Sequence, residues 1–328
     1  MSASITDKDL INLVFNNRPV PRVPVGFWFH FLDESRQGSG DGSFFSENVA
    51  GHRRFINSFQ PDMVKIMSDG FFYYPLHKPA DNPVEMLDKL ADVTAGHPWV
   101  RDQVRLIEAV RALKDDTSYF YNIFSPSTTL RFMVGRQTFL DWFSSFPDAT
   151  FRLLREMGRG IRILAAEAVA HGGADGVFFS VQNPDLQIFT DDDYRSFLLE
   201  DEVALLNDAK KAGGRNILHI CGYDGVRNRL EFFGDYPADA FSWAVNIENV
   251  SLGEGRKIFQ GKPVIGGFPN TAGSILHTGT KAEIEEFTEK ILLEAGRVGV
   301  IVGADCTVPT DIELERLRWV RTAANSVK

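Results

Sequence analysis

Residues 176–222 read GVFFSVQNPDLQIFTDDDYRSFLLEDEVALLNDAKKAGGRNILHICG, with two short apolar runs separated by a long helical segment. The apolar runs are 176–181 and 216–220, and the segment between them opens with acidic residues after Thr190 and closes at a Gly-Gly pair. Acidic residues favour the first turn of a helix, and glycine favours the position just after its end. The pattern predicts a strand–helix–strand unit whose two strands lie parallel.

The same alternation continues along the chain. Eight short apolar, β-rich runs are separated by segments of helical periodicity, and they lie at 23–29, 63–67, 118–124, 176–181, 216–220, 240–245, 263–268 and 300–302. This number of units predicts a single-domain (β/α)8 barrel (a TIM barrel) over residues 1–328, because such a fold needs ~250 residues plus insertions. A doubly wound open sheet is the alternative, although no predicted strand is followed by a G-x-G-x-x-G turn.

Three further helices have readable boundaries. Thr280 and Glu283 have the spacing of a capping box at the start of one helix, and Gly296 follows its end. Asp148 opens a second long helix, and a third covers about 311–324.

Two predicted loops are longer than a barrel requires. HFLDESRQGSGDGSFF follows the first predicted strand and is rich in glycine and serine, whereas SDGFFYYPLHKPADNP follows the second and is rich in aromatic residues and proline. Both loops follow the carboxyl ends of strands, which form the active-site face of a barrel. We therefore expect lid-like loops that help to enclose a pocket, with plain surface loops as the alternative.

The composition excludes several classes of protein. The chain has 44 acidic and 35 basic side chains and a formal net charge of −9, so a nucleic-acid-binding protein is not expected. No apolar run reaches the ~18 residues of a membrane span, and the first residues lack the pattern of a signal peptide, so we expect a cytoplasmic protein. Two cysteines are too few for a disulfide scaffold in a chain of this length.

His219-Ile220-Cys221 is the most specific chemical signal in the chain. Alternate side chains of a strand share a face, so His219 and Cys221 project to the same side. Cys306, at the end of the eighth predicted strand, can supply a second sulfur. Three N and S ligands with one open position describe a catalytic Zn²⁺ site. The alternative is a pair of buried free cysteines that act as small apolar side chains.

Other polar side chains lie at predicted strand ends. Asp69 and His30 are candidate catalytic residues that could orient a substrate or act as a general base. A turn cap is the alternative role for Asp69, and a core histidine is the alternative for His30. Gln182 and Asn246 are candidates for hydrogen bonds to a substrate, or they contribute only ordinary polarity to the barrel mouth.

An aromatic run follows the second predicted strand. It consists of Phe71, Phe72, Tyr73 and Tyr74. On a loop, such a run indicates either an apolar substrate-binding wall or the contact surface of a homodimer.

The stretches HICG, GADC and GGADGVFF together resemble the uroporphyrinogen decarboxylase superfamily, a (β/α)8 family, over essentially the whole chain. The His-x-Cys motif with a distant Cys is similar to its zinc-dependent methyltransferase branch, which moves methyl groups between corrinoid proteins and thiols. The resemblance implies that His219, Cys221 and Cys306 bind zinc, that the substrate is a small molecule, and that any corrinoid comes on a separate partner protein. Cobalamin-independent methionine synthase adds a Glu ligand, for which Glu248 is the nearest candidate.

The chain also departs from the decarboxylase pattern. Phe29 and Asp33 stand where the decarboxylase has an arginine-rich motif, so a many-carboxylate tetrapyrrole would lose its cationic partners. Asp69 matches a decarboxylase aspartate, whereas Phe132 and Cys306 stand at the positions of a tyrosine and a histidine.

These features together predict a zinc-dependent methyltransferase-like enzyme. It would activate a thiol or a related nucleophile for methyl transfer from a corrinoid protein or a small methyl donor. One alternative is a decarboxylase, a carboxy-lyase that acts on a different carboxylated substrate. Another is a non-catalytic module that binds a corrinoid or a tetrapyrrole.

Overall fold

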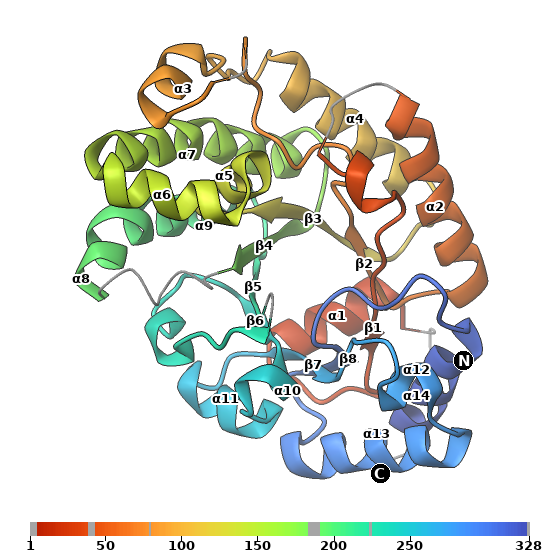
Figure 1. Cartoon of the computed structure of the whole chain (residues 1–328). Coiled ribbons are helices and arrows are strands. Elements are labelled where there is room, and N and C mark those ends of the chain that lie inside the picture. The colour runs from red at the N-terminus through yellow and green to blue at the C-terminus, as the bar shows by residue number, and fades with distance from the viewer. Residues whose placement is uncertain (1–4, 39–42, 79, 183–190, 223–224, 327–328) are drawn as a thin grey trace.

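The structure is a computed structural model that describes residues 5–38, 43–78, 80–182, 191–222 and 225–326. Eight parallel strands in these ranges form a near-closed barrel with helices around it (Figure 1). Hydrogen bonds join the strands in the order β1-β8-β7-β6-β5-β4-β3-β2, so the predicted (β/α)8 barrel is confirmed and the doubly wound alternative is wrong. The strands are β1 Val25–Gly26, β2 Met63–Ile66, β3 Ser118–Phe124, β4 Gly176–Gln182, β5 Ile217–Cys221, β6 Ala240–Trp243, β7 Val264–Phe268 and β8 Val300–Ala304.

Helices cover the outside of the barrel and one of its ends. Their bounds are α1 Asp7–Phe15, α2 Ser43–Phe59, α3 Pro83–Lys89, α4 Pro98–Arg111, α5 Pro126–Val134, α6 Arg136–Ser145, α7 Pro147–Ala170, α8 Asp191–Tyr194, α9 Glu200–Lys211, α10 Val245–Glu248, α11 Leu252–Ile258, α12 Ile275–Thr278, α13 Lys281–Ala295 and α14 Leu314–Ser326. Short helical turns are η1 Glu34–Arg36, the π-helical turn η3 Arg195–Leu199 and η5 Leu230–Phe233.

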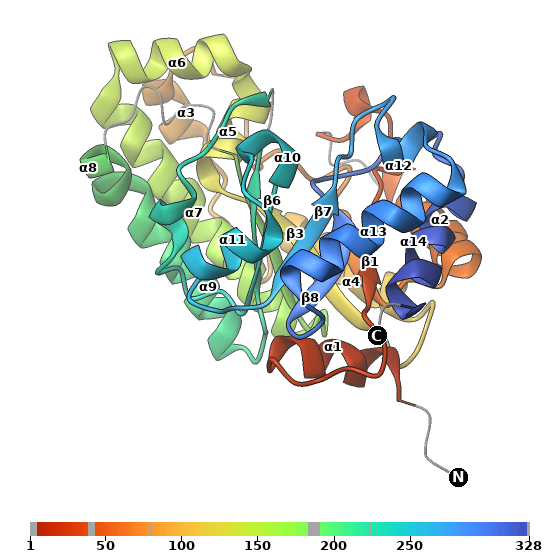
Figure 2. The same cartoon turned by 90° about the horizontal axis from the view of Figure 1, so that it is seen from below.

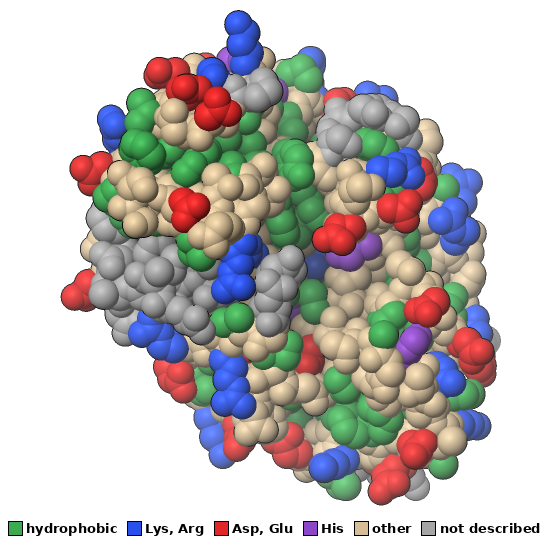
Figure 3. All heavy atoms as spheres, in the orientation of Figure 1, with side chains coloured by type: hydrophobic (Ala, Val, Ile, Leu, Met, Phe, Trp, Pro, Cys, Tyr) green, Lys and Arg blue, Asp and Glu red, His purple; other side chains and the backbone are tan. Residues whose placement is uncertain are grey.

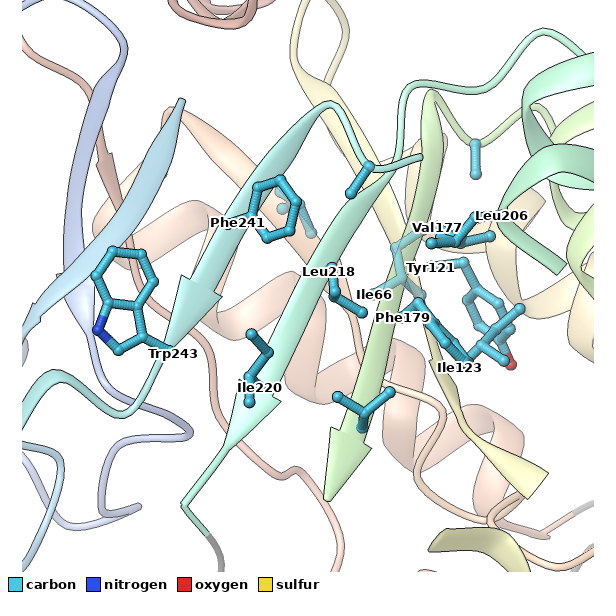
Figure 4. Packing of buried hydrophobic residues seen from close by; sticks show 14 of the residues in the cluster. Ile66, Tyr121, Ile123, Val177, Phe179, Leu206, Leu218, Ile220, Phe241 and Trp243 are labelled. Carbon is cyan, nitrogen blue, oxygen red and sulfur yellow. The ribbon is translucent and has the colours of Figure 1, made fainter. Parts of the chain in front are cut away.

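The strands have two differently packed faces. Leu218 and Ile220 of β5 and Phe241 and Trp243 of β6 project toward the helices and belong to the larger hydrophobic cluster (Figure 4). The side chains that alternate with them, such as Ile217, face the barrel interior. This alternation is what places selected polar residues inside the barrel.

Helix α1 closes the amino-terminal end of the barrel, and the sequence patterns did not predict it. Its buried Ile11, Val14 and Phe15 join the interior cluster, and the Phe15 ring centroid lies 5.5 Å from that of Phe120 on β3. Figure 2 shows α1 beneath this end of the barrel. The carboxyl ends of the strands therefore form the face available for a site.

Local signals predicted some boundaries better than others. The capping box at Thr280 and Glu283 is present at the start of α13, as expected. The first predicted strand, 23–29, was too long, because only β1 is paired there and Pro24 cannot donate to a ladder. The predicted helix after 190 is divided into α8, η3 and α9, and Thr190 lies outside the described residues.

A buried carboxyl ties the helices behind β4 and β5 together. Glu202 of α9 is 1% exposed, and its Oε2 accepts hydrogen bonds from the hydroxyls of Tyr194 at 2.7 Å and Tyr236 at 2.5 Å. Burial raises the pKa of Glu202 to about 7, although both hydroxyls oppose this shift.

Glu202 should make stability depend on pH. A carboxyl whose pKa is higher in the folded state takes up a proton on folding, so its contribution is complete below pH 4.5 and is lost as the pH approaches 7. We expect Glu202→Gln to reduce the loss of unfolding free energy between pH 5 and pH 8 by about 2–3 kcal/mol. Urea unfolding at both pH values measures this difference, and an equal loss in both proteins would contradict it.

Candidate metal centre and pocket

A cavity of about 400 Å³ opens at the carboxyl ends of the strands. The surface there is hollowed near its centre, with apolar side chains beside the opening and a histidine and an acidic side chain at its rim (Figure 3). The cavity lining includes six polar or sulfur-bearing side chains from the barrel strands and their ends, namely Lys65, Ser180, Gln182, His219, Cys221 and Cys306.

His219, Cys221 and Cys306 lie together in the lining of this cavity. The first two are alternate residues of β5, and Cys306 follows β8 two residues after its last residue. The potential ligand atoms of all three lie within 4.8 Å of one another, and the two sulfurs are 3.8 Å apart. Both cysteines are free thiols. The structure thus brings together the three residues that the sequence pattern singled out.

The imidazole of His219 is oriented by its neighbours. Its Nδ1 lies 3.1 Å from the Oγ of Ser242 on β6, and its ring packs 5.4 Å from the Phe178 ring. The other nitrogen, Nε2, is buried and has no hydrogen-bond partner among the described residues. When Nδ1–H donates to Ser242, Nε2 carries a free lone pair, as a metal ligand requires. A buried unpaired nitrogen beside two thiols fits a Zn²⁺ ion.

The contact between the two thiols shifts their pKa values in opposite directions. The bond to Cys306 raises the pKa of Cys221 well above its ordinary value. The same bond, with His219 and Lys65 nearby, lowers the pKa of Cys306. Metal binding requires cysteine ligands in the thiolate form, so a cation held here would displace the thiol protons.

Lys65 is a charged residue that the sequence reasoning missed. It lies in the middle of β2, is 5% exposed, and lines the cavity with the cysteines. Burial lowers the pKa of its amine to about 8, while the two cysteines and Asp69 oppose this shift. The available signal was a lysine at the centre of the apolar run MVKIM, where alternation gives it the same face as Met63 and Met67.

Asp69 and His30 form a hydrogen-bonded pair at the edge of the cavity. Asp69 is fully buried, and its Oδ1 lies 2.8 Å from His30 Nδ1. Its Oδ2 accepts from the backbone N–H of Phe31 at 2.6 Å and of Leu32 at 3.3 Å. His30 lines the cavity, with 30% of its side chain exposed, whereas Asp69 does not line it. Asp69 therefore orients His30 and the following backbone.

The loops after β1 and β2 meet above the cavity. The carbonyl oxygen of Gln37 accepts hydrogen bonds from the N–H groups of Gly70 and Phe72, at 2.8 and 3.2 Å. The Tyr73 ring lies so close to Gly38 that a Cβ there would be 2.3 Å from it. Both loops thus contribute to one wall, while their residues 39–42 and 79 lie outside the described residues.

Aromatic rings form another side of the cavity. Phe72 packs at 4.7 Å from Phe124 and 5.5 Å from Phe132, and all three line the cavity. Tyr73 also lines it and is 45% exposed. Phe71 instead lines a neighbouring cavity of about 20 Å³, so it does not reach the cysteines' cavity. Two residues of the aromatic run, Phe72 and Tyr73, therefore form part of the cavity wall.

Two further candidates have structural partners. Asn246 does not line the cavity. Its backbone N–H and its Nδ2 both donate to Oδ2 of the buried Asp305, at 2.9 Å, because α10 begins where the strand was expected to continue. Glu248 lies outside the three-residue metal cluster, and its carboxylate accepts from the backbone and side-chain N–H groups of Asn228.

Gln182 lies where it was expected, at the cavity. Its Oε1 accepts a hydrogen bond from the guanidinium of Arg131, a second buried cation that the sequence reasoning missed.

The fold and site define a (β/α)8 barrel protein with a candidate His/Cys/Cys metal centre at the carboxyl ends of its strands. Over residues 73–327 the sequence matches the family described as uroporphyrinogen decarboxylase (URO-D), and the chain belongs to this family. No curated protein matches the sequence. In the described parts of the chain, no helix is both long and apolar enough to cross a membrane.

Solved structures share the fold at low sequence identity. A methyltransferase from Methanosarcina mazei superposes with a TM-score of 0.70 at 16% identity, covering 98% of this chain and 99% of that one. A B12-independent methionine synthase from Shewanella sp. W3-18-1, in complex with selenomethionine, has a TM-score of 0.61 at 14% identity, covering 93% and 97%. At these identities the likeness concerns the fold alone.

Proposed function

We propose that the chain is a zinc-dependent methyltransferase-like enzyme and that residues 1–328 act as a single domain. It would activate a thiol, or a related nucleophile, for methyl transfer from a corrinoid protein or a small methyl donor. The observation that carries this proposal is the cluster of one buried imidazole nitrogen without a partner and two thiols, all within 4.8 Å and open to a cavity.

His219, Cys221 and Cys306 would hold the metal, and Ser242 would keep the imidazole in the required tautomer. A bound Zn²⁺ would supply the Lewis acidity that keeps a substrate thiol ionised near neutral pH. Three protein ligands leave one position for that substrate, which is the arrangement of catalytic zinc sites.

His30 is suited to proton handling. Because Nδ1 is held by Asp69, Nε2 is the ring nitrogen left for the cavity, where it can accept the proton of an incoming thiol. The rings of Phe72, Phe124 and Phe132 exclude water from one side of the reacting groups.

The cavity size limits which methyl donors can enter it. A volume of about 400 Å³ lies at the lower end of the range for small-molecule sites. A corrinoid would therefore have to approach the opening from outside, on its own carrier protein.

A decarboxylase remains the second candidate because the chain belongs to the URO-D family. The position of Asp69 argues against the decarboxylase pattern. Both of its carboxylate oxygens are engaged by His30 and the backbone of 31–32, and the fully buried residue does not line the cavity.

A methyl-transfer assay tests the proposal. The zinc-loaded protein is incubated with methylcobalamin and a panel of small thiols, and S-methylated product is measured by mass spectrometry. We expect product with wild type, none above background with Cys306→Ala, and a rate lower by about 10²-fold with His30→Ala. Absence of S-methylation, together with CO₂ release from carboxylated substrates by the zinc-stripped protein, would overturn the proposal in favour of the decarboxylase.

A further inference from the structure

Lys65 is a cation deep inside the barrel. Its side chain projects from the middle of β2 into the interior, and only 5% of the residue is exposed. The ammonium nitrogen lies 4.1 Å from the centroid of the Phe178 ring and 5.2 Å from that of Trp28. It also lines the cavity beside the cysteines, so it can be reached by a molecule bound there.

Within the described ranges, no hydrogen bond or ion pair satisfies this ammonium. Glu34 is the one described carboxylate in the lining of the cavity, and it lies within ion-pair distance of no lysine. The faces of Phe178 and Trp28 attract the charge, but cation–π contacts offset only part of the cost of removing an ammonium from water. The two cysteines and Asp69 favour the charged form of Lys65, but none of them is hydrogen-bonded to it. An anion that enters the cavity would give the ammonium a hydrogen-bonded partner.

A second donor faces the same cavity. The Oε1 of Gln182 is occupied by the Arg131 guanidinium, so the amide hydrogens on Nε2 remain to donate, and no described residue accepts from them. The aromatic wall of Phe72, Phe124 and Phe132 lies in the same lining and suits an apolar group.

We propose that Lys65 and Gln182 form an anion-binding subsite and that the substrate is a small carboxylic acid whose apolar part packs on Phe72, Phe124 and Phe132. The carboxylate would be held by the Lys65 ammonium and by the Gln182 amide. Such a subsite would define the substrate class of the proposed enzyme, so its role in catalysis rests on the proposed function. Binding to the subsite can be measured without any reaction.

Binding of phenylacetate to the full-length, as-purified protein tests the subsite. Phenylacetate carries a carboxylate and a ring, and phenylacetamide is its neutral counterpart. By calorimetry we expect phenylacetate to bind at least about tenfold more tightly than phenylacetamide, because only the carboxylate forms an ion pair with the ammonium. Equal affinities of the two compounds for wild type would overturn the proposal.

Variants assign the effect to Lys65. We expect Lys65→Met to weaken phenylacetate by about tenfold or more and to leave phenylacetamide unchanged, and Lys65→Arg to restore most of the affinity. Lys262→Met removes an exposed lysine and is expected to change neither affinity. Removing a buried charge is compatible with folding, and thermal unfolding checks this.

The zinc content of each variant distinguishes anion binding by Lys65 from an effect of Lys65 on zinc binding by the cysteines. It is measured for each variant alongside binding. If Lys65→Met lost zinc and phenylacetate binding together, Lys65 would serve only the cysteine cluster and the proposal would be wrong. Unchanged zinc with weakened phenylacetate binding supports it.

A kinetic comparison distinguishes this inference from the proposed function. With methylcobalamin as donor, 3-mercaptopropionate should be methylated with a kcat/KM about tenfold above that of 2-mercaptoethanol, and Lys65→Met should remove this preference. Equal methylation of both thiols would support the proposed methyltransferase function and contradict the subsite. Carboxylate binding without any methyl transfer would support the subsite and contradict the proposed methyltransferase function.

Discussion

The wild-type protein is expected to bind zinc in a one-to-one ratio, and replacement of Cys221 or Cys306 with alanine is expected to abolish this binding. Each change removes one of three ligands and leaves too few donors for a tetrahedral site. The affinity should fall by more than about 100-fold, since even loss of a hydrogen bond to a ligand costs about 10- to 100-fold. Metal analysis after dialysis measures the difference.

A graded control comes from the residue behind His219. Ser242→Ala leaves all three ligands and removes only the partner of Nδ1, so its zinc affinity should be lower by about 10- to 100-fold and lie between wild type and the cysteine variants. Wild-type protein without stoichiometric zinc, or Cys221→Ala protein with full zinc content, would contradict the metal centre. Anomalous scattering at the zinc edge would locate the ion directly.

Asp69→Ala should be the most destabilising change at the rim of the cavity. The fully buried carboxylate accepts hydrogen bonds from two backbone N–H groups and contacts His30. Alanine leaves these donors without an acceptor in a buried place, so we expect a loss of about 3–5 kcal/mol in the free energy of unfolding. Urea unfolding measures this loss.

His30→Ala separates the imidazole from the backbone role of Asp69. His30 is partly exposed and its removal leaves the bonds to the amides of Phe31 and Leu32 intact, so its cost should be below about 1 kcal/mol. If the two variants were equally stable, the backbone bonds of Asp69 would not support the loop as inferred. Comparable losses of activity, with unequal losses of stability, are the expected pattern.

Parts of the site follow from local patterns. His219 and Cys221 had to share a face because side chains alternate along any strand. The capping box at Thr280 and Glu283 involves neighbours three residues apart, and it formed as predicted.

Other parts were missed because a local pattern was overridden. Asn246 was expected at a strand end, but a helical turn begins at Val245 and the amide bonds to Asp305, which is 59 residues away. For Asp69 the sequence left open a role toward a substrate or a turn cap, and the loop after β1 folds back so that His30 and the backbone N–H groups of residues 31 and 32 engage both of its oxygens. In both cases the partner is distant in the chain and carries no signal near the residue itself.

The sequence alone determined the eight strand–helix units, the barrel class and the pairing of an imidazole with a thiol. It could do so because periodicity, caps and alternation act over a few residues. The sequence proposed Cys306 as a second sulfur ligand, and the tertiary structure shows that it comes within 3.8 Å of Cys221, 85 residues away. The tertiary structure alone shows that α1 closes one end of the barrel and that Lys65 is buried inside it. These features depend on which side chains meet when the strands curve into a barrel. Such contacts join distant residues, and no local pattern encodes them.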